Sequence, residues 1–79
     1  MDTNEKYNEI FCEVLEVSPE QLTGLKYHDT DLWDSVGHMT LVTALEDGFN
    51  IMMESEDIFD LSSYEKGKSI LTKKYDVIF

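Results

Sequence analysis

The sequence predicts an all-α fold, a four-helix bundle with three longer helices, one short third helix and a long loop between the first two. Apolar residues recur at helical spacing in three separate segments. Hydrophobic residues make up 42% of the chain and there is a single Pro, which argues for a compact folded protein. A length of 79 residues leaves room for one small core, so we expect a single domain over residues 1–79.

The first helix is predicted from Thr3 to Val17. Its apolar residues fall at positions i, i+3, i+4, i+7 and i+8, which is the stripe of a helix with one buried face: Tyr7, Ile10, Phe11, Val14 and Leu15. We expect Thr3 or Asn4 to cap this helix, with Glu5 in its first turn. Cys12 lies beside the stripe and is expected to pack rather than to react.

A long loop follows the first helix. Ser18-Pro19 can start one short turn and Gly24 can end it, after which no regular pattern occurs before Trp33. Connections longer than about 12 to 15 residues are uncommon in compact domains and are often functional. We expect four hydrophobic residues to hold the loop on the core: Leu22, Leu25, Leu32 and Trp33.

The second helix is predicted from Ser35 to Gly48 or Phe49. Successive turns of about 100° place five residues on a core face: His38, Leu41, Val42, Leu45 and Phe49. The opposite face carries Val36, Thr40, Thr43 and Asp47, flanked by Met39 and Glu46. Apolar residues at an exposed helix start, with acids at its far end, are typical of a docking strip. Scattered surface hydrophobes are the ordinary alternative.

The remaining segments complete the bundle. "FNIMM" alternates Phe49, Ile51 and Met53 inward, and "SEDIFDL" predicts a short helix capped by Ser55, with Ile58 and Leu61 facing in. Ser62 and Glu65 form a capping-box pattern before the last helix, on which Tyr64, Lys68, Leu71 and Tyr75 share a face. Gly67 weakens that helix by about 1 kcal/mol relative to Ala. The final "DVIF" either packs over the bundle or contacts a partner.

The charge balance favours some partners and disfavours others. Seventeen Asp and Glu oppose six Lys, and the formal net charge is −11. Such a field repels nucleic acid and anionic lipid and attracts basic proteins, although an acidic surface also serves plain solubility. No stretch approaches the roughly 20 apolar residues of a membrane span. A lone Cys and the absence of zinc-site spacing fit a reducing cytoplasm, and we expect a monomer without a metal.

Ser35 opens the second helix, where free N–H groups and the helix dipole favour an anion. The plain alternative is that Ser35 is only the N-cap. A hydrolytic nucleophile is disfavoured, because His38 is predicted to face the core and G-x-S-x-G is absent. Asp29, Asp31 and Asp34 resemble the start of a calcium loop. The required spacing fails at Trp33, Asp34 and Thr40.

Four features of the chain together carry a resemblance to a known family: Asp34-Ser35 before an aliphatic residue, the run "VGHMTLVTALEDGFNI", the long first loop, and a length of 79 residues with an acidic composition. With these features the chain resembles the acyl carrier protein family, the phosphopantetheine-dependent carriers. The resemblance covers nearly the whole chain, from the first helix through "LWDS" and "LVTALEDGFNI" to "DIFDLSS". It implies an acyl-carrier-like bundle without catalytic activity. A phosphopantetheinyl transferase would attach 4′-phosphopantetheine to Ser35, and the thiol of that arm would carry acyl or aminoacyl groups as thioesters.

The resemblance also implies roles for neighbouring residues. Asp34 takes part in recognition by the transferase. Val36, Met39 and Ile58 are apolar contacts for partner enzymes, and Glu46 and Asp47 pair with basic side chains on loading ligases and on downstream transferases or synthases. A long acyl chain sheltered between the helices is a hypothesis, with five residues as its lining: Val42, Leu45, Phe49, Ile58 and Leu71.

Departures from the family pattern narrow the pathway. Val36 replaces the usual Leu, Thr40 replaces a frequent acid and Gly48 ends a run that is often acidic. These departures weaken a role in general fatty-acid synthesis and favour a stand-alone carrier of a specialised pathway, within fatty-acid or polyketide biosynthesis. A peptidyl or aminoacyl carrier of a nonribosomal or surface-polymer pathway is the alternative. Carriers of large synthetases usually have Gly-Gly before the variable residue and the Ser, and Trp33-Asp34 argues against that branch. Alternatives of another class are an acidic calcium-binding protein and a plain protein-interaction module.

Overall fold

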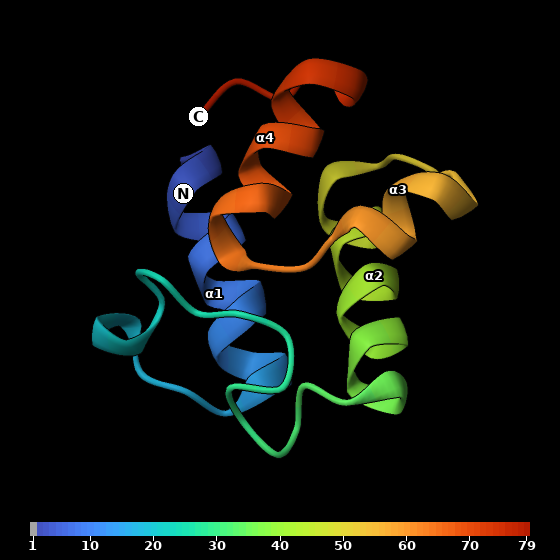
Figure 1. The fold of residues 1–79 in the computed structure, drawn as a ribbon. Helices are drawn as coiled ribbons and strands as arrows, with labels where there is room; N and C mark the ends of the chain where they lie inside the picture. The colour runs from blue at the N-terminus through green and yellow to red at the C-terminus, as the bar shows by residue number, and fades with distance from the viewer. Residues whose placement is uncertain (1) are drawn as a thin grey trace.

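The computed structural model describes residues 2–79 and confirms the predicted all-helical fold class. Its elements are α1 (Thr3–Leu15), the 3₁₀-helix η1 (Pro19–Gln21), α2 (Ser35–Phe49), α3 (Ser55–Asp60) and α4 (Tyr64–Tyr75) (Figure 1). No strand occurs within residues 2–79, where an isolated bridge joins Lys26 and Ser63. No helix in the described part of the chain is both long and apolar enough to span a membrane.

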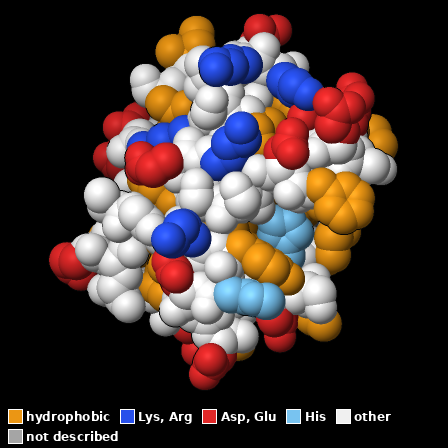
Figure 2. Space-filling model, viewed as in Figure 1, with side chains coloured by type: hydrophobic (Ala, Val, Ile, Leu, Met, Phe, Trp, Pro, Cys, Tyr) orange, Lys and Arg blue, Asp and Glu red, His pale blue; other side chains and the backbone are white. Residues whose placement is uncertain are grey.

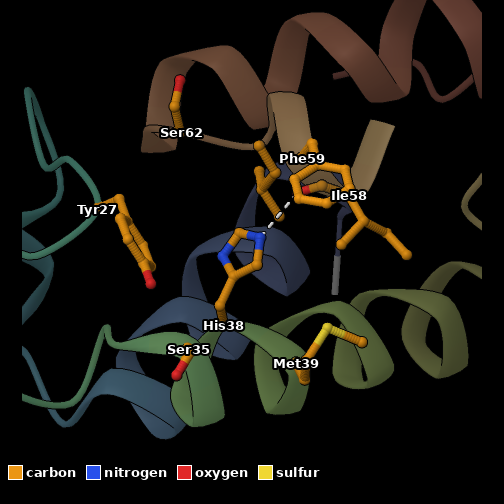
Figure 3. A pocket seen from close by; sticks show the side chains of 8 residues that line it. Tyr27, Ser35, His38, Met39, Ile58, Phe59 and Ser62 are labelled. Carbon is orange, nitrogen blue, oxygen red and sulfur yellow. Dashed lines mark hydrogen bonds between the residues drawn. The ribbon is translucent and has the colours of Figure 1, made fainter. Parts of the chain in front are cut away.

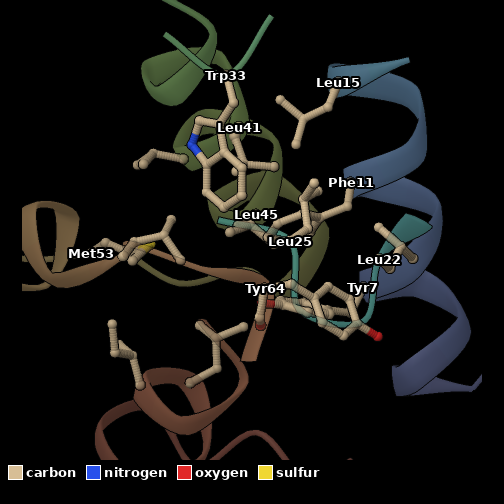
Figure 4. Close-up of a cluster of buried hydrophobic side chains, with 14 residues drawn as sticks. Tyr7, Phe11, Leu15, Leu22, Leu25, Trp33, Leu41, Leu45, Met53 and Tyr64 are labelled. Carbon is tan, nitrogen blue, oxygen red and sulfur yellow. The ribbon is translucent and has the colours of Figure 1, made fainter. Parts of the chain in front are cut away.

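Helices α1 and α2 run in opposite directions and pack together. Helix α4 lies beside α1, and the short α3 lies beside α2 (Figure 1). The core lies between these elements and is rich in aromatic residues (Figure 4). Phe11 meets the rings of Trp33 and Tyr64 edge to face, at centroid distances of 5.6 and 5.4 Å. Such pairs add stability beyond their burial.

Helix α1 follows its predicted stripe, but its ends differ from the prediction. The cap is Asp2, whose Oδ1 accepts the Glu5 N–H at 2.8 Å, so the prediction of Thr3 or Asn4 was wrong. An Asp one position earlier satisfies the same free N–H group and adds a favourable charge at the positive end of the dipole. The helix ends at Leu15, because Glu16 takes a left-handed conformation (φ 54°).

The long loop is held by both side chains and backbone. Leu22, Leu25 and Trp33 are buried, as predicted. Leu32 is 42% exposed, and its predicted burial was wrong, because a turn closed by Trp33 N–H on the Thr30 carbonyl (3.1 Å) sends the indole inward and Leu32 outward.

The same loop pairs with the segment that joins α3 to α4. Tyr27 N–H donates to the Ser62 carbonyl and Tyr64 N–H donates to the Leu25 carbonyl, both at 2.9 Å. This pairing fixes a loop that has little helical structure of its own, and it brings Tyr27 and Ser62 beside each other.

Helix α2 begins at Ser35 and ends at Phe49, as predicted. Leu41, Val42 and Leu45 are fully buried, whereas His38 and Phe49 on the same face are half-buried. The predicted core face is therefore correct at its centre and reaches solvent at both ends.

Helices α3 and α4 occur where predicted, but their caps differ. Ser55 is the first residue of α3 and follows the N-cap Glu54, so it is not the cap. Ser63, not Ser62, caps α4 by accepting the Lys66 N–H at 3.0 Å. The Ser62–Glu65 capping box was therefore wrong by one residue. The pairing of the Ser62 carbonyl with Tyr27 keeps Ser62 in the loop.

Gly67 has a packing role that its helix propensity does not indicate. A β-carbon at this position would collide with the Tyr7 hydroxyl, which donates to the Tyr64 carbonyl at 2.7 Å. The glycine thus permits close approach of α1 and α4. Burial raises the pKa of Tyr7, so this buried hydroxyl keeps its proton and remains a donor.

The tail after α4 partly packs over the bundle. The Phe79 ring lies 5.2 Å from that of Tyr7 and 6.3 Å from that of Phe49, and Val77 packs against the core. Ile78 is 84% exposed. One of the two predicted alternatives, packing over the bundle, therefore holds for Val77 and Phe79.

Candidate functional site

Ser35 is exposed on the first turn of α2, and it is not the N-cap. Asp34 has that role: its Oδ1 accepts the Gly37 N–H at 2.8 Å, and its carbonyl accepts the His38 N–H at the same distance. The plain alternative, in which Ser35 serves as the cap, was therefore wrong. Among residues 2–79 no group hydrogen-bonds the Ser35 hydroxyl, which leaves it available at the positive end of the helix.

Gly37 lets the end of the loop lie against this first turn. A β-carbon at position 37 would collide with the Leu32 carbonyl, a backbone atom that cannot move aside as a side chain can. The close approach fixes the backbone on both sides of Asp34 and Ser35. The hydroxyl is therefore presented from a rigid turn rather than from a mobile loop.

Beside Ser35, the indole of buried Trp33 donates Nε1–H to His38 Nδ1 at 3.0 Å. An indole can only donate, so Nδ1 is the acceptor and the ring hydrogen is on Nε2. Nε2 lies 2.8 Å from the Ile58 carbonyl and donates to it. Both ring nitrogens are thereby engaged, and neither is free to take the hydroxyl proton of Ser35.

A pocket of about 470 Å³ opens between α2, α3 and the first loop, with Ser35 on its edge (Figure 3). It is lined by Tyr27, Ser35, His38, Met39, Ile58, Phe59, Leu61 and Ser62. The volume and the apolar lining with few polar groups are typical of small-molecule sites. Of the predicted partner residues, Met39 and half-buried Ile58 lie here, facing each other from α2 and α3.

Ser35 also borders a shallower hollow of about 710 Å³ along the exposed face of α2. This hollow is lined by Ser35, Val36, Met39, Thr40, Thr43, Ala44 and Asp47. Val36 is 74% exposed and Met39 50% exposed, and Asp47 is exposed at the far end. The structure therefore brings three of the predicted partner residues together on one face, with Ser35 at its start.

Glu46 is placed differently from Asp47. Its side chain is half-buried, and Oε2 accepts the Met53 N–H at 2.8 Å. This carboxylate therefore has a structural task, fixing the segment between α2 and α3. It is less accessible than Asp47 to a basic side chain of a partner.

Sequence reasoning missed Phe59 and Tyr27 as site residues. Phe59 is 87% exposed on α3 and borders the pocket. The exposure of Phe59 could have been predicted from the sequence. If Ile58 and Leu61 face inward, the residue after Ile58 lies on the outer side of the short helix. Tyr27 reaches the pocket through the loop pairing, which no local pattern indicates.

Basic residues are segregated from this region. The chain between Lys26 and Lys66, which supplies all of α2 and α3, contains no Lys or Arg. Four of the six lysines belong to α4, and most blue side chains in Figure 2 lie over that helix, whereas hydrophobic side chains and histidine gather on the side where α2 and α3 lie. Exposed Glu54, Glu56 and Asp60 add negative charge around Phe59. The site is therefore apolar at its centre and acidic around it.

Two aspartates of the calcium-loop pattern, Asp29 and Asp34, have structural tasks. Asp29 Oδ2 accepts the Lys26 N–H at 2.8 Å, and Asp34 caps α2. Across residues 2–79, no three or more His, Cys, Asp or Glu side chains are grouped so that they could hold a metal ion.

Cys12 is far from Ser35 in the sequence and packs against the core. Partial burial and, secondarily, the Glu20 carboxylate raise the pKa of its thiol. Because the thiolate is the reactive form, this shift makes Cys12 a poor nucleophile.

No protein-family model, curated protein or solved structure matches this chain. The function is therefore inferred from the residues and their geometry.

Proposed function

We propose that the protein is an acyl carrier, with 4′-phosphopantetheine attached to Ser35 and acyl or aminoacyl groups held as thioesters on that arm. The observation that carries the proposal is the state of Ser35. Its hydroxyl is exposed and unpartnered within the described residues, while the neighbouring Asp34 satisfies the helix end. A hydroxyl that has no capping task, on a rigid turn between an apolar pocket and an acidic face, suits attachment of an arm.

The site fits the group chemically. A phosphodiester on Ser35 keeps a negative charge beside the first N–H groups of α2, where the dipole favours it. In the transfer, Ser35 Oγ forms its bond to the phosphorus as the bond to the adenosine bisphosphate part of coenzyme A breaks. The hydroxyl proton goes to a base on the transferase, because both nitrogens of His38 are engaged. The arm supplies the thiol that forms the thioester.

The face beside Ser35 supports docking of basic partner enzymes. Val36 and Met39 provide exposed apolar contacts, and Asp47 provides an accessible charge. Ile58 and Phe59 extend this surface across the pocket to α3. We therefore propose the transferase, a loading ligase and downstream transferases or synthases as partners, with Asp34 among the residues that the transferase contacts.

The structure changes the hypothesis of a sheltered acyl chain. Val42, Leu45 and Leu71 are 0 to 1% exposed and belong to the core, so an acyl chain would have to enter the core to reach them. Only Ile58 of the proposed lining borders the pocket. The surface pocket next to α3 is therefore the space that an arm on Ser35 reaches without entering the core.

The first test is an intact mass after incubation with coenzyme A, Mg²⁺ and a broad-specificity phosphopantetheinyl transferase. We expect the parent protein to gain one phosphopantetheine group and Ser35→Ala to gain none. Ser62→Ala is the matched control, because Ser62 is also an exposed serine on the same pocket. It should be modified like the parent.

If the folded parent protein gains no mass, the carrier proposal is contradicted. The exposed apolar residues beside Ser35 would then favour the plain interaction module. A gain that persists in Ser35→Ala and disappears in Ser62→Ala would move the attachment point across the pocket.

A further inference from the structure

Helix α3 depends on contacts with other elements for its position. It has only six residues, fewer than an isolated helix needs for stability in water. Its N-cap Glu54 makes no capping hydrogen bond through its side chain. Its last turn leaves carbonyl groups without partners inside the helix, and these must be satisfied from outside.

The last turn of α3 is tied to α2 by His38. The imidazole donates to the Ile58 carbonyl, while its other nitrogen accepts from the Trp33 indole (Figure 3). The ring lies 15° from parallel to that of Trp33, at a centroid distance of 6.4 Å, and Tyr27 meets it edge to face at 5.4 Å. One side chain thus connects the loop, the start of α2 and the end of α3.

The first turn of α3 is tied to α4 by a separate set of contacts. The Tyr75 hydroxyl donates to Asp57 Oδ2 at 2.6 Å and accepts the Glu54 N–H at 2.9 Å. Lys74 Nζ lies 2.8 Å from Asp57 Oδ1, an ion pair without the angles of a hydrogen bond. None of these groups lines the pocket beside Ser35, so this end serves as a comparison for the other.

We propose that His38 is a positioning residue that holds the Ile58–Phe59 edge of α3 against the start of α2, and thereby sets the opening of the pocket beside Ser35. The consequence for partners rests on the proposed carrier function. Because Met39 and Phe59 line opposite sides of this pocket, a shift of α3 changes the surface that a partner enzyme meets. Ser35 itself stays on α2, where Asp34 fixes the turn independently of α3.

The decisive variant is His38→Leu, which removes both hydrogen bonds while keeping an apolar side chain. In the unmodified protein we expect the hydrogen-bonded backbone N–H groups of α3, those of residues 58–61, and the Trp33 indole N–H to exchange with solvent at least about fivefold faster, as for one lost hydrogen bond. His38→Gln keeps one acceptor and one donor, so it should recover most of the protection. NMR hydrogen exchange measures both, and Trp33 is the only tryptophan.

Tyr75→Phe is the matched control. It loosens the other end of α3 and should speed exchange of the N–H groups of residues 58–61 while leaving exchange of the Trp33 indole N–H unchanged. In the transferase reaction, His38→Leu should raise the KM for the carrier about threefold or more with kcat preserved, and His38→Gln should restore it.

Unchanged exchange at residues 58–61 in folded His38→Leu would overturn the proposal, as would a loss confined to kcat. If the parent is not modified at all, the carrier function fails by itself. The exchange measurements then still decide whether His38 positions α3, because they need no transferase.

Discussion

At the scale of single residues, the site depends on a division of tasks between two neighbours. Asp34 satisfies the end of α2 with its carboxylate, and Ser35 is thereby left with an unoccupied hydroxyl. A serine that both capped the helix and received a modification would lose the cap when modified. Here the modification leaves the first turn intact, so the fold and the proposed attachment do not compete.

This division gives a prediction for Asp34. Asp34→Ala removes the cap and should lower the free energy of unfolding by about 1 kcal/mol, whereas Asn is nearly as good a cap and Asp34→Asn should cost less than about 0.5 kcal/mol. If the transferase reads the charge of Asp34, both variants should lose kcat/KM for modification. Urea unfolding and transferase kinetics measure the two effects. Full modification of Asp34→Asn would show that only the capped turn is recognised.

The sequence located helix caps only to within one or two residues. Thr3 or Asn4 was predicted where Asp2 is the cap, and Ser62 where Ser63 is the cap. Asp34 was treated as a motif residue rather than as the cap. Adjacent polar residues compete for the same N–H groups, and the winner depends on the path of the preceding chain. For Ser62 that path is fixed by Tyr27, which lies 35 positions away in the sequence.

At the scale of elements, α3 shows how a short helix acquires a defined position. His38 holds one end, and Asp57 with Lys74 and Tyr75 holds the other. The proximity of Lys74, followed by the Tyr75 hydrogen bond, lowers the pKa of Asp57 against the opposing effect of its burial. Asp57 is therefore a buried carboxylate whose charge is used to pin the helix.

The lowered pKa of Asp57 makes its contribution depend on pH. A carboxyl group whose folded pKa lies below its ordinary value of 3.8 stabilises the fold fully above that value, and the stabilisation is lost as the pH falls through the folded pKa. The difference in unfolding free energy between the parent and Asp57→Asn should therefore stay constant from about pH 7 to about pH 5 and shrink below about pH 4. The contributions of the other acidic residues are the same in both proteins, so they largely cancel in this difference. A difference that persists at about pH 2 would mean that packing, not charge, is the contribution of Asp57.

The helices themselves were predictable, but the pocket was not. The periodicity of Leu41, Val42 and Leu45 sets which face of α2 is buried, and that information is local. The pocket also needs Tyr27 and Ser62, which meet through backbone pairing between two irregular segments. Likewise, whether Leu32 or Trp33 turns inward is decided by a loop turn that has no periodic signal.

At the scale of the whole molecule, charge is both large and uneven. Residues 27–65 carry no Lys or Arg, and within the described chain only Lys74 forms ion pairs, with Glu56 and Asp57. Most of the 17 acids are therefore not neutralised by a nearby base. This steers basic partners toward α2 and α3, and it also makes the compact state repel itself.

The self-repulsion predicts that salt stabilises the fold without specificity. Raising NaCl from about 0.01 M to about 1 M shortens the screening length from roughly 30 Å to roughly 3 Å. The melting temperature should rise by about 4 to 8 °C for each kcal/mol of repulsion relieved, and KCl should give the same curve.

Divalent ions turn the same melting experiment into a test of the calcium alternative. Asp29 and Asp34 are engaged by backbone N–H groups, and no metal-holding group of acids is found within residues 2–79, so CaCl₂ and MgCl₂ at equal ionic strength should raise the melting temperature equally. Screening depends on ionic strength and valence, not on which divalent ion is present. An ion that binds a specific site in the folded state stabilises the fold in proportion to the logarithm of the ion concentration, even at low ionic strength. A stabilisation by Ca²⁺ alone, lost in Asp29→Asn, would contradict a purely electrostatic surface and restore the calcium-binding alternative.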